Sequence, residues 1–289
     1  MKKSILYILY ILSLLSLSAC ENQDPSMSDQ SMPIVVEGWI ENGVSPVVMV
    51  THAVNLTADS VSFDNFVEKW CRVSVYDGDT RYLLTGTVNK DYTPSFIFTS
   101  SSLKGKTGHA YRLLIEFEAR TIQSTSTIMD APVISRLEPI AVEDNDTLFS
   151  IRAFVSGIDP ERHYKIFVKS GKEDSRYYGS FLGTFSGNEY DDFKGLTITK
   201  GIHAVHDEDA FSHYFSKGDV VRVKIASMQP EIYNFWKIYD NTVSLSNNLL
   251  FTFTSNLPTN LVLTDSDADT PAPLGYWAAY GISESVIRL

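Results

Sequence analysis

Ile34-Val35-Val36-Glu37-Gly38-Trp39-Ile40, followed by Glu41-Asn42-Gly43, is the stretch of sequence that decides the fold class. Its first seven residues are mostly β-branched or aromatic, which favours a strand, and Asn-Gly is a strong signal for a tight turn. The run Pro46–Val50 follows as the return strand, with the proline at its start, where a missing N–H does least harm. A β-hairpin is therefore expected at the start of the folded chain.

The same signals recur up to about residue 130. Cys71, Val73 and Val75 alternate with polar or exposed-type residues, a period of two that predicts a strand with one buried face. Asp77-Gly78 supplies the next turn. Further strands are expected at Tyr82–Leu84, at Phe96–Phe98 and in the long segment Tyr111–Ile128. Several short strands with turns between them predict an immunoglobulin-like β-sandwich over residues 33–130.

A second β-rich domain is expected over residues 131–289, because Pro132 and Pro139 are predicted to interrupt sheet pairing. It is predicted to be an antiparallel sandwich or barrel-like sheet, with strands around residues 149–155, 164–168, 177–185, 221–225 and 276–287. One segment has helical spacing instead. Ile232, Phe235, Trp236 and Tyr239 predict one amphipathic helix near residues 230–244, packed with its aromatic stripe against a sheet. The whole chain is thus expected to be mainly β.

The first nineteen residues have the pattern of a lipoprotein signal peptide. Lys2 and Lys3 precede an apolar stretch, Ile5–Leu17, that is shorter than the roughly 20 residues needed to cross a bilayer. Leu17-Ser18-Ala19-Cys20 then predicts cleavage before Cys20 and acylation of its thiol, with each buried CH₂ of the lipid contributing about 0.8 kcal/mol. The alternative is ordinary secretion with Cys20 an incidental thiol. Residues 20–32, acidic and serine-rich after the cysteine, are expected to form a flexible tether.

The net charge limits the classes of partner that are expected, and the cysteine content limits the disulfides. The 289-residue chain has a formal net charge of −11, and removing residues 1–19 leaves 22 basic and 35 acidic side chains, a net charge of −13. This balance argues against nucleic acid, and it implies that membrane attachment comes from the lipid alone. With Cys20 acylated, Cys71 is the one remaining cysteine, so no intramolecular disulfide is expected, and Cys71 is interpreted as a core residue.

One histidine-rich segment could bind a divalent metal. His203, His206, Asp207, Asp209 and His213 combine imidazoles and carboxylates, the ligand types of zinc and related ions. The alternative is an exposed acidic loop. Further on, Asp265-Ser266-Asp267-Ala268-Asp269 imitates a calcium loop, but Thr270 and Tyr276 stand where such a loop needs Gly and Glu, so an EF-hand is excluded.

Two aromatic pairs are candidate ligand contacts. In a strand, one side chain of each adjacent pair Tyr177-Tyr178 and Tyr276-Trp277 is expected to face outward or into a cavity, where it could stack on a sugar or small ligand. The alternative is that these residues are ordinary sheet cover.

Catalytic motifs are absent from the sequence. No Gly-x-Ser-x-Gly, P-loop, dinucleotide fingerprint or His-Glu-x-x-His motif occurs, so no catalytic residue is assigned and an enzyme is not expected. Carboxylate pairs leave no short signature, and Asp191, Asp192 or Asp207 could serve a hydrolase.

An ordered set of segments runs through nearly all of the mature chain: the lipobox at Cys20, residues 35–40, 73–78, 218–223, 231–236 and 256–260, and Leu274–Tyr280. In these segments the chain resembles a family of surface lipoproteins of unknown function that is common in Bacteroidetes-type bacteria. The acidic run Thr264–Pro273 departs from the family pattern, in which a glycine-rich turn is expected. Members are typically encoded beside TonB-dependent outer-membrane transporters, and no catalytic residues are known for the group.

The resemblance implies a lipid-anchored outer-membrane protein, on the periplasmic or cell-surface face, that assists a TonB-dependent transporter in nutrient uptake by binding substrate or capping the barrel. No cofactor is expected besides the acyl lipid on Cys20, and a divalent metal at the histidine-rich segment stays an open alternative to an exposed acidic loop. Two other classes stay open: a cell-surface adhesin or structural module, and a surface hydrolase that uses unmarked carboxylates.

Overall fold

The structure is a computed structural model of the chain, and it describes residues 32–53, 63–171, 174–201, 212–245, 257–264 and 270–289. Most of these residues lie in strands: β1 (Ile34–Glu41), β2 (Val47–His52), β3 (Arg72–Asp77), β4 (Thr80–Leu83), β5 (Thr85–Val88), β6 (Phe96–Thr99), β7 (Ala110–Phe117), β8 (Arg120–Thr127), β9 (Val133–Val142), β10 (Asn145–Ser156), β11 (His163–Ser170), β12 (Tyr178–Ser186), β13 (Leu196–Ile198), β14 (Phe215–Ser216), β15 (Val220–Met228), β16 (Val262–Thr264) and β17 (Leu274–Arg288). The described helices are α2 (Pro230–Leu245) and two short 3₁₀ turns, η2 (Phe63–Phe66) and η3 (Gly187–Glu189). The expected mainly β class with one packed α-helix is confirmed for this part of the chain.

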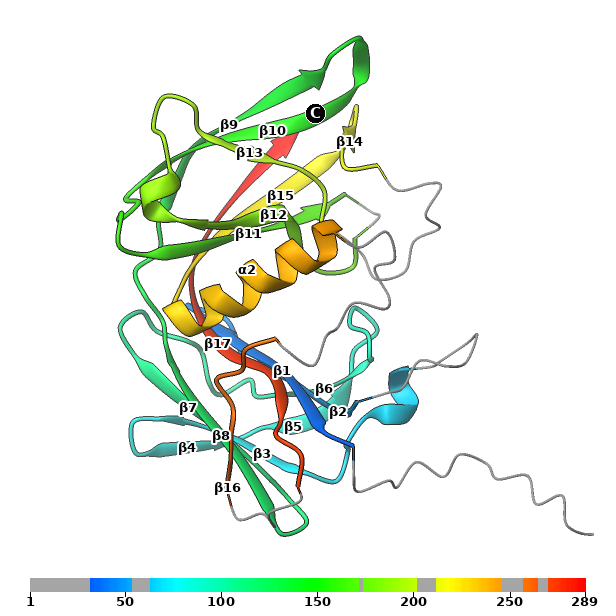
Figure 1. Ribbon diagram of the computed structural model, residues 1–289, viewed down its shortest axis with the longest axis vertical. Coiled ribbons are helices and arrows are strands. Elements are labelled where there is room, and N and C mark those ends of the chain that lie inside the picture. The colour runs from blue at the N-terminus through cyan, green and yellow to red at the C-terminus, as the bar shows by residue number, and fades with distance from the viewer. Residues whose placement is uncertain (1–31, 54–62, 172–173, 202–211, 246–256, 265–269) are drawn as a thin grey trace, which may run out of the picture. The chain divides into compact units, whose positions relative to one another are not determined.

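The strands form three sheets. The largest has the order β12-β11-β15-β17-β1-β2-β6-β5, and a five-stranded sheet has the order β16-β8-β7-β3-β4. The third sheet is β13-β10-β14, with β9 paired to β10. Figure 1 shows the five-stranded sheet beside the β1–β2 half of the large sheet, and β9, β10 and β13 beside its β11–β12 half.

Strand β17 joins the two halves of the large sheet. Its first part, Leu274–Tyr280, runs parallel to β1, and from Gly281 onward it runs antiparallel to β15. A Cβ on Gly281 would collide with the carbonyl oxygen of Met129, so the change of partner takes place where only glycine fits. Residues on both sides of the sequence boundary expected near residue 130 therefore share one sheet, and Pro33–Leu289 is one compact unit.

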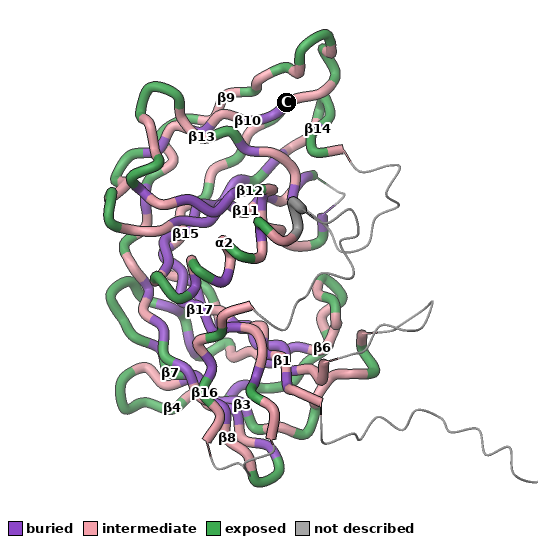
Figure 2. The backbone as a smooth tube through the Cα atoms, viewed as in Figure 1, coloured by how far each residue is buried: buried purple, intermediate pink, exposed green. Residues whose placement is uncertain are grey.

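Two hydrophobic cores lie against this sheet. The first packs Val36, Ile40 and Trp277 of the large sheet with residues of the five-stranded sheet such as Leu113 and Ile115. The second packs Ile166 and Val223 with Ile151 of the smaller sheet. In Figure 2 the buried residues accordingly follow the strands, while the exposed ones are mainly at turns. Each half of the large sheet is thus one layer of a β-sandwich.

Helix α2 covers the opposite face of the large sheet. Ile232 and Phe235 pack against Tyr276, Ala278 and Tyr280 of β17 in a third cluster, which is separate from both sandwich cores. Pro230 opens the helix, where its missing N–H costs nothing, and the apolar stripe faces the sheet as expected. The helix therefore lies over the face that the two cores leave free.

Two local expectations differ from the structure. The long segment expected at Tyr111–Ile128 is a hairpin, β7 and β8, that turns at Glu118, a residue with a positive φ of 49°. Pro139 does not interrupt pairing: it lies inside β9, opposite Ile151 of β10. Within the described sheet β9 pairs only with β10, and an edge strand tolerates a residue that cannot donate on its outer side.

Candidate functional site

The face of the large sheet that carries α2 also carries a group of ionisable side chains. Alternation along β1 directs Val36 and Ile40 to the first core, so Glu37, Trp39 and Glu41 lie on the opposite face. The parallel register sets Glu37 opposite Tyr276 and Glu41 opposite Tyr280. Polar and aromatic residues from β1 and β17 therefore meet on one surface, beside the helix.

The first polar contact on this face is a buried ion pair that connects α2 to β11. The ammonium group of Lys165 donates to both carboxylate oxygens of Asp240, at 2.7 and 2.8 Å, and the N–H of Thr184 donates to Oδ2 of Asp240 at 3.1 Å. The two charged side chains are only 1% and 7% exposed. Burial lowers the pKa of Lys165, while the Asp240 carboxylate acts in the opposite direction.

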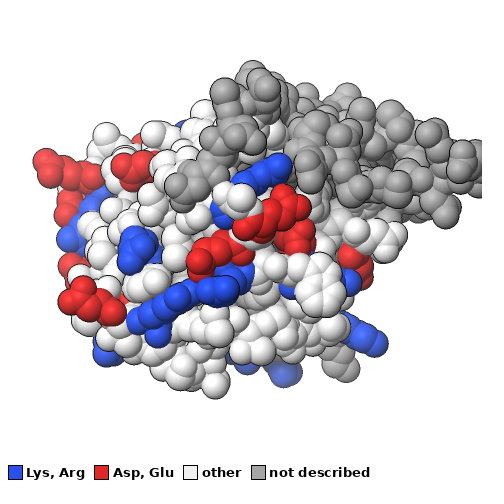
Figure 3. All heavy atoms as spheres, turned by 90° about the horizontal axis from the view of Figure 1, so that it is seen from below, with Lys and Arg blue, Asp and Glu red and all other residues white. Residues whose placement is uncertain are grey.

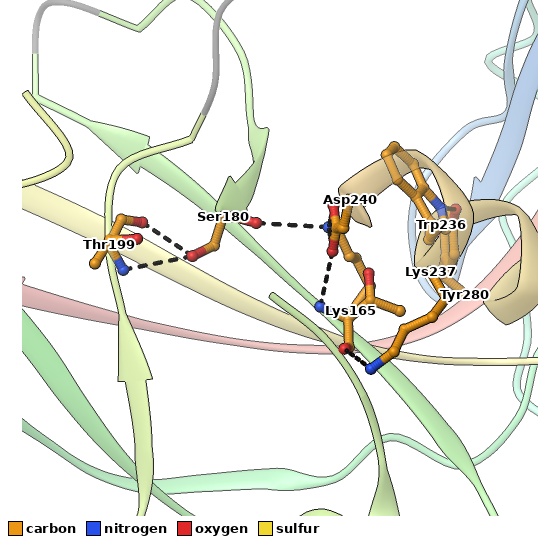
Figure 4. A network of polar contacts seen from close by, with 8 residues as sticks. Lys165, Ser180, Thr199, Trp236, Lys237, Asp240 and Tyr280 are labelled. Atoms are coloured by element: carbon orange, nitrogen blue, oxygen red, sulfur yellow. Dashed lines mark hydrogen bonds and ion pairs between the residues drawn. The ribbon is translucent and has the colours of Figure 1, made fainter. Parts of the chain in front are cut away.

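The surroundings of this pair complete a closed network, shown in Figure 4. The indole of Trp236 lies 4.9 Å from the Lys165 ammonium, and its N–H donates to the Tyr280 hydroxyl at 2.8 Å. With its hydrogen bonds made inside the protein, the Lys165–Asp240 pair is a structural clamp that holds the helix on the sheet.

A second buried ion pair lies on the same face. Lys224 of β15 donates to both oxygens of Glu41, at 2.9 and 2.8 Å, and its ammonium lies 4.1 Å from the ring centre of Tyr177. Burial raises the pKa of the Tyr177 hydroxyl, and the nearby Glu284 acts in the same direction. This contact links β1, β15 and the segment that precedes β12.

The third polar group on this face is half-buried, and we call it the Glu37 cluster: Glu37, Tyr92, Arg176, Tyr178 and Tyr276. The Tyr276 hydroxyl donates to Oε1 of Glu37 at 3.3 Å. The Arg176 guanidinium lies 5.5 Å from the ring centre of Tyr92 and 5.3 Å from that of Tyr178. Trp39 extends the group, since its ring is 6.0 Å from Tyr92. Four separate parts of the chain contribute these side chains.

Two phenols near Glu37, those of Tyr276 and Tyr239, have a raised pKa and remain protonated at neutral pH. Burial is the main cause that raises the pKa of Tyr276 well above its usual value, and the Glu37 carboxylate adds to it. The same two causes, in the same order, raise the pKa of Tyr239 on α2 to about 12. The cluster thus combines one carboxylate, one guanidinium and several phenol hydroxyls with aromatic ring faces.

This combination suits non-covalent recognition. Glu37 accepts hydrogen bonds, Arg176 donates them in a planar fork, and the rings offer apolar surface for stacking. Unlike the two closed ion pairs, Glu37, Arg176, Tyr92 and Tyr178 keep part of their surface accessible to solvent. Among the described residues, no group of three His, Cys, Asp or Glu side chains could hold a metal ion.

The structure brings two of the four predicted ligand contacts together. Tyr178 and Tyr276 both belong to the Glu37 cluster, whereas Tyr177 lies at the neighbouring Lys224. Trp277 is not a surface residue: it is 0% exposed in the first core, and its indole N–H donates to the carbonyl oxygen of Tyr111 at 2.9 Å. Alternation does not expose a side chain here, because β17 is covered on one face by the five-stranded sheet and on the other by α2.

Sequence reasoning missed Glu37, Tyr92 and Arg176. The signal for Glu37 was present, since it alternates with apolar residues in the first strand and shares a face with Trp39 and Glu41. Arg176 comes from a connection without periodicity, and the contact of Ser175 with the carbonyl of Asp91, at 3.0 Å, shows how that connection reaches Tyr92. Only the folded chain brings these segments together.

Most of the histidine-rich metal candidate lies outside the described residues, namely His203, His206, Asp207 and Asp209. His213 is described, and its ring lies 4.6 Å from that of Phe181. Cys20 and the acidic run 265–269 also lie outside the described part. Of the carboxylates considered for a hydrolase, Asp191 accepts a hydrogen bond from the N–H of Phe193, which lowers its pKa, and Asp192 is exposed.

The described surface carries charges of both signs. Figure 3 shows acidic and basic side chains next to one another on the face that it presents. Exposed ion pairs of this kind include Arg81 with Glu116 at 3.0 Å and Arg136 with Glu138 at 3.1 Å. Such pairs contribute little to stability, typically below about 1 kcal/mol.

The fold and the site define a mainly β protein in which two sandwiches share one large sheet, and in which a helix and a half-buried polar cluster occupy the free face. The chain belongs to the family described as "Domain of unknown function (DUF4249)", whose model matches residues 21–284. No curated protein matches the chain significantly. Within the described residues, no helix has both the length and the apolar character needed to cross a membrane.

Proposed function

We propose that this protein is a lipid-anchored, outer-membrane accessory protein that works with a TonB-dependent transporter and binds a ligand non-covalently at the Glu37 cluster. The half-buried cluster is the observation that carries the binding role. A carboxylate, a guanidinium and ring faces gather on a solvent-accessible surface, while Lys165 with Asp240 and Lys224 with Glu41 on the same face are closed into ion pairs.

The anchoring role rests on the sequence around Cys20 and on the family resemblance. Acylation at Cys20 would hold the folded part near the membrane through residues 21–32, and a tethered binding site gains affinity from its high local concentration. The net charge of −13 on the mature chain would favour cations, neutral oligomers or peptides over anionic ligands.

Co-purification tests whether the protein associates with a TonB-dependent transporter. The acylated protein is extracted in mild detergent, captured through a tag at its carboxyl end, and the proteins that accompany it are identified by mass spectrometry. A TonB-dependent transporter is expected among them. Finding none in repeated extractions would contradict the proposal and favour an adhesin or structural module.

Two variants refine the result. Cys20→Ser removes the anchor and is expected to reduce the amount of transporter recovered, because the partners then meet only by diffusion. Arg176→Ala alters the Glu37 cluster and is expected to leave recovery unchanged if the cluster binds ligand. Loss of the transporter with Arg176→Ala would instead mean that the cluster caps the barrel.

A further inference from the structure

Trp70 is almost completely exposed. Its exposed fraction is 94%, although its backbone is held by a hydrogen bond from its N–H to Oε1 of Glu68 at 2.8 Å. Of the other three tryptophans, Trp277 is buried, and Trp39 and Trp236 are half-buried. Single exposed apolar residues are common, so the meaning of Trp70 depends on its neighbours and on its place in the fold.

Lys69, the residue before Trp70, reaches an aromatic ring near the edge of the large sheet. The ammonium of Lys69 lies 5.9 Å from the ring centre of Phe96, and Phe96 pairs with Val88 on the edge strand β5, where Val88 is 64% exposed. Directly opposed residues of two strands share a face. Phe96 is half-buried and also packs against the first core. We use the name Trp70 surface for Trp70, the adjacent Lys69, and the pair Phe96 and Val88 that Lys69 approaches through Phe96.

The acidic residues beside this surface already have partners. Glu68 contacts His52 at 3.2 Å, and Oδ1 of Asp64 accepts hydrogen bonds from the N–H and hydroxyl of Ser95, at 2.7 and 3.1 Å. Arg72 is exposed but lies 3.9 Å from Glu116. Lys69 is exposed and places a positive charge next to Trp70.

The Trp70 surface lies beside the point where the chain enters the fold. The carbonyl oxygen of Pro33 accepts from the N–H of Ala53 at 2.9 Å, and Ile34 pairs with His52, the residue that contacts Glu68. Residues 21–32 separate this point from Cys20. At about 3.3–3.6 Å per extended residue, they keep it within roughly 40 Å of a lipid on Cys20.

We propose that the Trp70 surface contacts the lipid headgroup region of the membrane that holds the Cys20 anchor. The inference rests on the acylation that the proposed function includes. Tryptophan prefers the interface between water and hydrocarbon, and lysine next to it reaches the phosphate groups with its ammonium while its stem stays on apolar surface. Such a contact is weak alone, but a tethered surface meets the bilayer at high local concentration.

Tryptophan fluorescence in vesicles of brominated phosphatidylcholine tests the contact with the full acylated protein, because bromine quenches only the indoles that enter the lipid. The emission is expected to be lower than in vesicles without bromine, and Trp70→Phe is expected to abolish that difference. Adding phosphatidylglycerol to the vesicles is expected to increase the quenching through the Lys69 ammonium.

A relocated tryptophan provides the control. Phe193 is 96% exposed, and it lies in the connection between Tyr190, which packs against the second core, and Leu196, which pairs with Ala153 of that core. The double variant Trp70→Phe/Phe193→Trp is expected to be quenched by acrylamide in water and not by brominated lipid. Equal lipid quenching at both positions, or none at position 70, overturns the proposal.

Two further measurements show whether a negative result comes from missing acylation, from a missing membrane contact, or from a protein partner on the same surface. Fatty-acid labelling of the same sample reads the acylation, so an unlabelled protein overturns the anchor and the contact together, whereas a labelled but unquenched protein overturns only the contact. Protection of Trp70 from acrylamide only after the transporter is added would assign the surface to a protein partner and also overturn the membrane contact.

Discussion

Removal of the Asp240 carboxylate should destabilise the protein strongly. Asp240→Ala leaves the Lys165 ammonium, 1% exposed, without its counter-ion, and it also takes the acceptor from the N–H of Thr184. Breaking a buried ion pair from one side typically costs about 3–5 kcal/mol. For a chain of this size each kcal/mol lowers Tm by about 2–4 °C, so we expect a fall of roughly 6–20 °C.

Urea and thermal unfolding, followed by circular dichroism, measure this effect. Glu138→Ala is the matched control, because Glu138 pairs with Arg136 at a similar distance, 3.1 Å, on the exposed surface. The control is expected to change the free energy of unfolding by less than about 1 kcal/mol. Replacing both Lys165 and Asp240 by apolar residues should cost less than Asp240→Ala alone, since no unpaired charge remains. If Asp240→Ala were as mild as the control, the clamp described for α2 would be wrong.

Three further predictions concern single groups. Burial and the nearby Glu68 raise the pKa of Cys71 to about 12, so its thiol should react slowly with iodoacetamide at pH 8 and rapidly after unfolding in urea; fast labelling of the folded protein would contradict this. Burial lowers the pKa of His163, so as pH falls below about 6.5 this histidine takes up a proton more readily in the unfolded chain than in the folded one. The free energy of unfolding should therefore decrease between pH 7 and 5, and it should decrease by more than in His163→Phe. Identical pH profiles of unfolding for the two proteins would refute the assignment. Gly281→Ala should lower the free energy of unfolding by about 1–3 kcal/mol, because its methyl group would meet the Met129 carbonyl. Val286 is exposed on the same strand, so Val286→Ala should lower it by less. Equal Tm values for the two variants would exclude that steric cause.

Period-two alternation was enough to predict several strands. In β1, β3 and β11 one face is more buried than the other, so the pattern is visible in the sequence and the hairpin at Asn42-Gly43 follows from it. Alternation failed in β17, where Tyr276–Gly281 is buried on both faces and the sequence has no period. The exposed member expected in the pair Tyr276-Trp277 is absent for this reason.

The Glu37 cluster was only partly predictable. Tyr178 and Tyr276 were identified as aromatic residues in strands, but their meeting with Glu37 depends on the parallel pairing of β1 with β17. Arg176 joins them from the connection before β12, whose course no local pattern encodes. Contacts between residues more than a hundred positions apart are a property of the fold, so short-range reasoning finds the residue types and not their assembly.

The double role of β17 has a consequence for biogenesis. Val35 pairs with Leu274, and Val221 pairs with Ile287, so the large sheet lacks a central strand until residues 274–288 have been synthesised. Pairings across such separations close slowly, because the entropy of a long loop is lost before any contact is gained. The large sheet is therefore expected to close late in folding, after residues 274–288 have become available to pair with β1 and β15.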